Sequence, residues 1–297
     1  MRRPVVRMIA IVATVVAGGA LTSTQSASGV DPTTRFGASI KTQGSETYQA
    51  AFARSEQRYG RLGVVRYFDT NAPDSWSSLQ AKFADRPAIV SFRIAPSVVL
   101  TGSQDAALRA WFASAPTDRP TWWAYMHEPE DDIAHGDFTA AQFRNAFARI
   151  ATIADGVGNP QLHATLVLMC YTVNPTSGRN WRNYYADGSV DAIGWDCYNH
   201  KWRSNSYGTP DALMGRAITT SQSVGLPWGI AELGSLLGKG DNGSARAAWL
   251  TASARYVHQQ GGEFLSYFDT NGKGTDYRLT DEPSRKAWYD VVSDQTP

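Results

Sequence analysis

The sequence predicts a single (β/α)8 TIM barrel, an α/β fold in which eight parallel strands close into a cylinder inside a ring of helices. Eight short runs rich in β-branched and aromatic residues recur along the chain, separated by segments with apolar residues three or four positions apart. About 270 residues follow the first 28 of the 297-residue chain, which is a common size for one such barrel.

The eight runs are the expected strands. They cover Arg35–Ile40, Val64–Phe68, Ala88–Phe92, Trp122–Met126, His163–Met169, Val190–Cys197, Trp228–Ala231 and Glu263–Phe268. Strands that alternate with helices favour a parallel sheet, and right-handed crossovers place the helices outside a closed one. A doubly wound open sheet is the rival fold. It would favour a glycine-rich phosphate loop after the first strand, and residues 38–42 (ASIKT) are not one.

Helical spacing and end signals fill the intervals between the runs. Tyr48 and Phe52 lie four positions apart in the first interval. Thr139, followed three residues later by Gln142, predicts a capping box at the start of the fourth helix. The pair Gly261-Gly262 is expected to end the seventh helix before the last strand.

The first 28 residues are expected to be a secretory signal peptide. Basic residues at positions 2 and 3 precede an apolar run from Met8 to Leu21, and a small polar stretch follows. The run is shorter than the ~20 residues that a membrane-spanning helix needs. We therefore expect a secreted protein without a membrane segment after cleavage, with residues 29–297 forming one catalytic domain.

Charge and composition limit the partners. The formal net charge is +1 and no basic stripe occurs, which argues against nucleic acid or anionic lipid as partner. Ten Trp, thirteen Tyr and eleven Phe would serve both a core and a sugar-binding cleft. We expect an uncharged polysaccharide or oligosaccharide substrate, no cofactor and a monomer. The five histidines include no closely spaced pair, so no metal site is expected.

The two cysteines, Cys170 and Cys197, leave their state open. An exported protein meets an oxidising compartment in which a disulfide persists, but sequence alone does not show whether the two lie within bonding range.

Two glutamates are the candidate catalytic residues. Glu128 follows the fourth expected strand and Glu232 follows the seventh. Barrel enzymes place their active sites at the carboxyl ends of the strands, and strands four and seven face each other across the mouth. Retaining glycosidases need a carboxylic acid and a carboxylate about 5 Å apart. The sequence thus predicts Glu128 and Glu232 as the acid and carboxylate pair of a retaining glycoside hydrolase.

Three motifs resemble glycoside hydrolase family 26, the β-mannanase family. They are residues 127–130 (HEPE), 194–199 (GWDCYN) and 231–235 (AELGS), and the resemblance extends from about Arg35 to the C-terminus. The resemblance implies that Glu128 is the acid/base and Glu232 the nucleophile. It also implies that His127 binds a substrate hydroxyl and that Tyr198 donates a hydrogen bond to Glu232. It also implies a supporting role for Asp196.

The sequence departs from that clan at the end of strand eight. Many members carry a tryptophan there as a sugar platform, whereas this chain reads Ser-Tyr-Phe-Asp at residues 266–269. The glycan therefore stays open between β-mannan, mixed-linkage β-glucan and β-xylan, with endo-acting cleavage expected.

Further side chains are candidates for binding sugar. Trp181, Trp202 and Tyr207 lie in loops after strands five and six and are candidates for stacking, while Arg66 and Arg93 could bind sugar hydroxyls or anchor the carboxylates. Residues 130–132 (EDD) are expected to begin a solvated loop.

A carbohydrate-binding barrel without activity is the alternative of a different class. It would keep the aromatic cleft, but recognition alone does not require two facing carboxylates.

Overall fold

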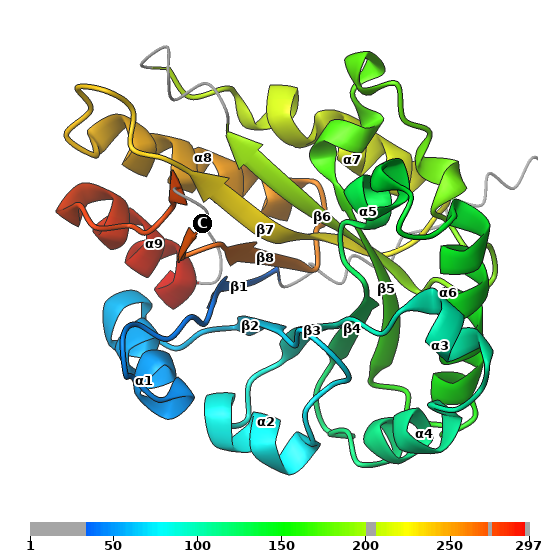
Figure 1. The fold of residues 1–297 in the computed structure, drawn as a ribbon. Helices are drawn as coiled ribbons and strands as arrows, with labels where there is room; N and C mark the ends of the chain where they lie inside the picture. Colours follow the sequence, from blue (N-terminus) through cyan, green and yellow to red (C-terminus); the bar gives the residue numbers. More distant parts are fainter. Residues whose placement is uncertain (1–33, 200–205, 273–274, 295–297) are drawn as a thin grey trace, which may run out of the picture. The chain divides into compact units, whose positions relative to one another are not determined.

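The structure, a computed structural model, describes residues 34–199, 206–272 and 275–294. It confirms the predicted fold, because strands β1 to β8 form a closed barrel in chain order in which every pairing is parallel, including that of β8 with β1. Figure 1 shows the strands at the centre and the helices around them. The strands are β1 Arg35–Ser39, β2 Val64–Phe68, β3 Ala88–Phe92, β4 Thr121–Tyr125, β5 Leu162–Met169, β6 Ala192–Asn199, β7 Trp228–Ser235 and β8 Phe264–Tyr267.

The strand bounds agree with expectation within two residues except at one end. β7 continues to Ser235, four residues beyond the expected end at Ala231. The extra residues pair with the end of β6, where Tyr198 lies opposite Gly234. Glu232 therefore lies within a strand and not in the loop after it.

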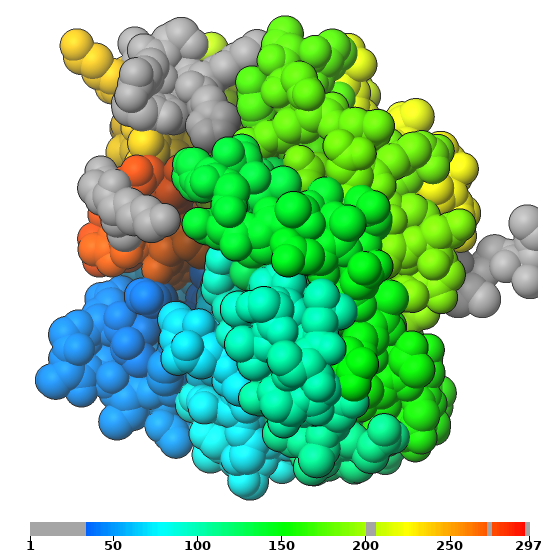
Figure 2. All heavy atoms as spheres, turned by 45° about the vertical axis from the view of Figure 1, so that its right-hand side comes forward, coloured from blue at the N-terminus to red at the C-terminus, as the bar shows by residue number. Residues whose placement is uncertain are grey.

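Helices and short turns connect the strands. The helices are α1 Tyr48–Tyr59, α2 Trp76–Phe83, α3 Pro96–Leu100, α4 Asp105–Ala113, α5 Pro129–His135, α6 Ala140–Asp155, α7 Pro210–Ser223, α8 Ser244–Gln259 and α9 Glu282–Asp294, with 3-10 turns η1 Cys170–Val173, η2 Pro175–Ser177 and η3 Trp181–Asn183 and a hairpin of β9 Asn271–Gly272 and β10 Thr275–Asp276. Figure 2 shows the cyan-to-green segments together on the face of the molecule turned to the viewer. The predicted capping box of Thr139 and Gln142 is present at the start of α6.

The core has two layers. Between strands and helices lies a large apolar cluster that includes Trp123 and Phe147, whose rings stack at 5.4 Å. Inside the barrel lies a separate small cluster, in which Trp122 of β4 meets Phe264 of β8 at 4.8 Å between ring centroids. Because β4 and β8 are not neighbours in the sheet, these rings meet in the barrel interior, near the amino ends of the strands.

In β2 and β6, the side chains that face the barrel interior change from apolar to polar toward the carboxyl end of the strand. Side chains two positions apart share one face of a strand. Val64 inside β2 is thus followed by Arg66, and Ala192 inside β6 by Gly194 and then Asp196. The same inner face therefore begins apolar and ends in ionisable groups at the carboxyl ends of the strands.

Two further features concern the cysteines and the helices. Cys170 in η1 and Cys197 in β6 are joined by a disulfide, which answers the question left open by the sequence. Among the residues described, no helix has the length and apolar character needed to cross a bilayer.

Candidate active site

A cavity of about 510 Å3 opens at the carboxyl ends of the strands. Four of the residues predicted from sequence line it, namely His127, Glu128, Tyr198 and Glu232. The other lining residues are Ser39, Ile40, Lys41, Phe68, Phe268, Thr270, Asn271, Thr275 and Tyr277. Both glutamates thus face one cavity at the end of the barrel where catalytic groups of this fold lie.

An irregularity in β7 turns Glu232 into the cavity. The β6–β7 register shifts so that Trp195 pairs with Ile230 and the next residue, Asp196, pairs with Glu232. Ala231 is passed over and belongs to the interior cluster. A bulge of this kind re-aims side chains. It lets two consecutive residues, Ala231 and Glu232, both face inward.

Two donors hold the Glu232 side chain in place. The Arg66 guanidinium donates to Oε1 at 3.1 Å, and the Tyr198 hydroxyl donates to Oε2. Arg66 is fully buried and Glu232 is 4% exposed, so water screens their attraction little. Arg66 also donates to Ser91 at 2.6 Å and lies 4.0 Å above the Phe68 ring. A carboxylate held by charge-assisted hydrogen bonds is suited to act as a nucleophile.

Glu128 lies on a left-handed turn at the end of β4. Met126 has φ 46° and Glu128 has φ 52°, a conformation that costs about 1–3 kcal/mol for such residues and clusters at functional sites. Burial raises the pKa of Glu128 to about 8, the negative charges of Glu232 and Glu130 add to the rise, and Arg66 opposes it. The carboxyl is thus mostly protonated at neutral pH, as an acid catalyst requires.

His127 lies beside Glu128 with its ring 5.3 Å from that of Phe68. Burial, with smaller contributions from Arg66 and Arg93, lowers the pKa of the imidazole well below its usual value. His127 is therefore neutral at physiological pH. Its Nδ1 is buried and meets no hydrogen-bonding group of the described residues.

Asp196 lies on β6, beneath Tyr198 and opposite Glu232 in the ladder. Its side chain is 2% exposed, and neither carboxyl oxygen has a hydrogen-bond partner within the described parts of the chain. Burial, together with the charges of Glu232 and Glu128, raises its pKa well above the usual value. Asp196 is therefore a buried carboxyl whose ionisation is disfavoured beside Glu232.

Four of the predicted aromatic and basic side chains are absent from the cavity lining, namely Trp181, Tyr207, Arg93 and Arg66, the last of which contacts Glu232. Trp181 in η3 packs against Tyr185, with ring centroids 5.3 Å apart. Tyr207 donates to Asp241 at 2.8 Å. Arg93 pairs with Asp132 of α5 and with neither of the two cavity glutamates among the described contacts. Trp202 lies outside the described residues.

The expectation of a solvated loop at residues 130–132 is wrong. These residues form the first turn of helix α5, and Glu130 is 1% exposed. Its Oε1 accepts hydrogen bonds from Met169 N at 2.8 Å and from the Thr172 hydroxyl at 2.5 Å. Asp131 pairs with Arg179. Burial of Glu130 depends on groups about 40 residues away, which local composition does not reveal.

The sequence reasoning missed an aromatic wall beside Glu232. Phe268 packs edge-on against Phe68 at 6.1 Å and against Tyr198 at 5.7 Å, and Tyr277 lies 4.9 Å from Tyr198. Inner-face alternation could have found Phe68, two residues after Arg66, and Phe268, two residues after Ser266. Tyr277 follows the short β9–β10 hairpin and carries no such signal.

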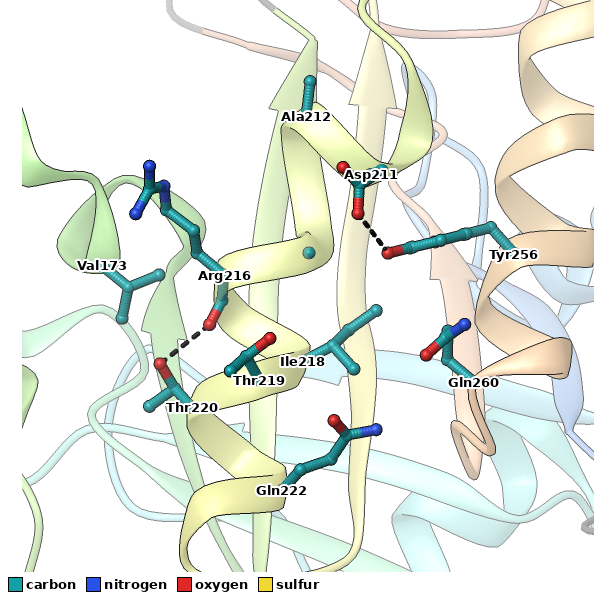
Figure 3. A pocket seen from close by; sticks show the side chains of 11 residues that line it. Val173, Asp211, Ala212, Arg216, Ile218, Thr219, Thr220, Gln222, Tyr256 and Gln260 are labelled. Carbon is teal, nitrogen blue, oxygen red and sulfur yellow. Dashed lines mark hydrogen bonds between the residues drawn. The ribbon is translucent and has the colours of Figure 1, made fainter.

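A second hollow lies in the outer helical layer. It measures about 950 Å3 and is lined by α7 and neighbouring segments, including Asp211 and Tyr256 (Figure 3). Its one carboxylate, Asp211, accepts from the Tyr256 hydroxyl at 2.8 Å. This hollow holds one carboxylate, whereas two face the barrel-mouth cavity, so the barrel mouth is the better candidate. No set of three or more His, Cys, Asp or Glu within the described ranges is placed to hold a metal ion.

Comparison with protein-family models and with curated proteins finds no match. Solved structures share the fold at low identity. A GH26 β-mannanase from Bacteroides ovatus has a TM-score of 0.56 at 13% identity, with 89% of each chain covered. A GH5-4 broad specificity endoglucanase from Clostridum cellulovorans has a TM-score of 0.60 at 11% identity, with 90% of this chain and 95% of that chain covered.

A GH128 endo-β-1,3-glucanase from Amycolatopsis mediterranei, solved with laminaripentaose, has a TM-score of 0.54 at 14% identity and covers 86% of this chain and 98% of its own. The chain therefore shares its (β/α)8 barrel with glycoside hydrolases that include mannanases and glucanases.

Proposed function

We propose that this protein is a retaining glycoside hydrolase that cleaves β-linked polysaccharide, such as β-mannan or a related β-glucan or β-xylan. The observation that carries the proposal is the pair of glutamates in one cavity. Glu128 holds a proton near neutral pH because its pKa is about 8, whereas Glu232 is paired with Arg66 and Tyr198. One acid and one carboxylate are what double displacement needs.

In the first step, a Glu232 oxygen attacks the anomeric carbon while the glycosidic C–O bond breaks. Glu128 gives its proton to the departing oxygen, and a glycosyl ester on Glu232 forms. In the second step, Glu128, now a carboxylate, takes a proton from water as the water oxygen attacks the same carbon. Glu232 leaves as a carboxylate and Glu128 is protonated again.

The surrounding residues support both charge states. Arg66 and Tyr198 hold Glu232 in place for attack, and the neutral His127 is placed at the cavity to bind a sugar hydroxyl. Burial raises the pKa of Asp196 well above its usual value, which disfavours a further negative charge beside the pair. Phe68, Phe268 and Tyr277 offer apolar ring surface to a sugar, in place of the clan's tryptophan.

The proposal also covers the family, the mode of cleavage, the oligomeric state and the export of the protein. The motifs support a relation to family 26, and we propose further that the protein cleaves within polymers and is a monomer. Residues 1–28 are proposed to direct secretion. A binding protein on the same barrel would not need one protonated and one ionised carboxyl, so activity decides between the two.

The test is reducing-sugar release from β-mannan, mixed-linkage β-glucan, β-1,3-xylan and β-1,4-xylan. We expect the parent to cleave one of them and Glu232→Gln to show no turnover. Glu128→Ala should lose about 10²–10⁴-fold on the polymer, the usual contribution of general acid catalysis. It should lose much less on an activated aryl β-glycoside of the same sugar, whose leaving group needs little protonation.

Glu263→Gln is the matched control, because Glu263 lies just before β8 at the opposite end of the barrel, where it accepts from the Trp122 indole. It should retain parental activity. A parent that binds polysaccharide but releases no sugar would support the binding protein, and full activity of Glu232→Gln would refute the proposed mechanism.

A further inference from the structure

We propose that Glu130 is a positioning residue for the acid/base Glu128, and that its carboxylate ends the β4–β5 hydrogen-bond ladder and fixes the left-handed turn from which Glu128 projects. The inference rests on the proposed role of Glu128 and adds a residue that acts through it. Glu130 lines no part of the barrel-mouth cavity, so it is not a catalytic residue.

The ladder between β4 and β5 shows the need for such an anchor. Regular pairing ends where Trp123 meets Ala164. Beyond that point the chain of β4 enters the turn with positive φ at Met126 and Glu128. The Glu128 amide still donates to the Val167 carbonyl at 3.0 Å. Two residues further along β5, the Met169 amide donates to the Glu130 carboxylate at 2.8 Å. A side-chain oxygen thus takes the place of the next strand carbonyl.

A second donor ties the same oxygen to the turn after β5. The Thr172 hydroxyl, 1% exposed, donates to Glu130 Oε1 at 2.5 Å. Thr172 lies in η1, which begins at Cys170, and the disulfide joins Cys170 to Cys197. Cys197 stands between Asp196 and Tyr198 on β6. Glu130 therefore connects the turn that bears the acid/base to the strand that bears two other site residues.

The two acidic neighbours of Glu130 hold α5 in a different way. Asp131 pairs with Arg179 and is 54% exposed, and Asp132 pairs with Arg93 and is 24% exposed. Both pairs remain open to solvent on at least one side chain, and ion pairs in contact with water contribute little. Glu130 alone among these three carboxylates is buried and bonded to the backbone of β5, so it is the one whose removal should move Glu128.

The charge of Glu130 also reaches the site. It raises the pKa of Glu128 as a third cause after burial and Glu232. Charged and titratable groups from several elements face this pair, and all must be held constant in a comparison. They are Arg66 on β2, Glu232 on β7, Asp196 and Tyr198 on β6, Arg179 and Tyr184 after β5, Asp131 on α5 and Tyr277 before α9.

Two substitutions separate position from charge. Glu130→Gln keeps an oxygen that can accept from Met169 and Thr172 but removes the charge. Glu130→Ala removes both. Asp131→Asn is the matched control, because it removes a charge from the adjacent residue of α5 while leaving the buried anchor intact.

Activity is measured on the polymer that the parent cleaves and on an activated aryl β-glycoside. We expect Glu130→Ala to lose about 10²-fold in kcat on the polymer, the cost of a misplacement of about 1 Å in a catalytic group. KM should stay within about twofold, since Glu130 does not contact substrate, and the loss on the aryl glycoside should be much smaller. Equal losses on both substrates would overturn the positioning role.

Titration of the Glu128 carboxyl supplies a readout that does not depend on activity. Proteins labelled with 13C at the glutamate carboxyl are followed by NMR against pH, with Glu128→Gln identifying the signal. Glu130→Gln should lower the titration midpoint of Glu128, because a neighbouring negative charge is gone, while kcat on the polymer stays within a few fold. A midpoint that moves no more than in Asp131→Asn would contradict the proposal.

The two readouts separate this inference from the proposed function. A parent inactive on every glycan would refute the function, and the NMR titration would still decide whether Glu130 acts on Glu128. If Glu130→Ala fails to fold, Thr172→Val removes one of the two hydrogen bonds and retains the carboxylate. Thr172→Val should lose less kcat than Glu130→Ala, again with a larger loss on the polymer than on the aryl glycoside. An unchanged kcat on the polymer would overturn the anchoring role.

Discussion

At the scale of single residues, the site depends on the buried contact of Arg66 with Glu232. The sequence identifies both cavity glutamates as candidates, because each lies near the carboxyl end of an expected barrel strand, where the active sites of this fold lie. The sequence does not identify the partner of Glu232, because Arg66 is equally suited to binding a sugar hydroxyl. The structure assigns Arg66 to the carboxylate at 3.1 Å. Glu130 escaped prediction because its burial depends on Thr172, which is distant in sequence.

Removing Arg66 tests that contact. Arg66→Met should destabilise the fold by about 3–5 kcal/mol, since breaking a buried pair leaves one charge uncompensated. Adding Glu232→Gln should recover much of the loss, because the stranded charge is then gone. Urea unfolding of both single variants and the double variant measures the coupling. Arg61→Met, which removes an exposed pair with Asp85, should cost less than about 1 kcal/mol. Strictly additive losses would refute a buried ion pair.

At the scale of elements, strands β6 and β7 place three site residues. The alternation of β6 turns Asp196 and Tyr198 to one face, and the shifted register of β7 turns Glu232 toward them. The sequence predicts both strands but ends β7 at Ala231. Its continuation, Glu-Leu-Gly-Ser, has weak strand propensity, and pairing with β6 stabilises it instead. A bulge has no clear sequence signal either, so the inward turn of Glu232 could be expected only from its chemistry.

Gly234 on β7 makes room for Tyr198. A Cβ at that position would lie 2.6 Å from Cε1 of the Tyr198 ring. Gly234→Ala should therefore displace the ring that donates to Glu232 and lower kcat by about 10–100-fold, in line with small displacements near a reacting group. Steady-state kinetics on the cleaved polymer, with a circular dichroism melt, measures this. Gly156→Ala at the end of α6, where the nearest contacts are 3.4 Å, should leave kcat unchanged. An unaffected Gly234→Ala would mean that the tyrosine position is unimportant.

At the scale of the whole molecule, the closed barrel brings residues from six strand ends to one cavity. The fold could be predicted from sequence because its signal, eight regularly spaced strands, repeats along the chain. The aromatic wall of Phe68, Phe268 and Tyr277 could not, since it forms only when β2, β8 and the chain before α9 meet. The disulfide links η1 to β6 and closes a loop of 27 residues, which stabilises a fold by about 3–4 kcal/mol in the chain-entropy account.

The stereochemistry of cleavage tests the central claim, that Glu128 and Glu232 act by double displacement. The parent is mixed with the β-linked polymer that it cleaves, and the first-formed reducing end is observed by proton NMR before mutarotation. Attack by Glu232 followed by attack of water on the same carbon inverts the centre twice, so the account predicts that the β-anomer is formed first. An α-anomer formed first would contradict it, because water would then have attacked directly and Glu232 would not be the nucleophile.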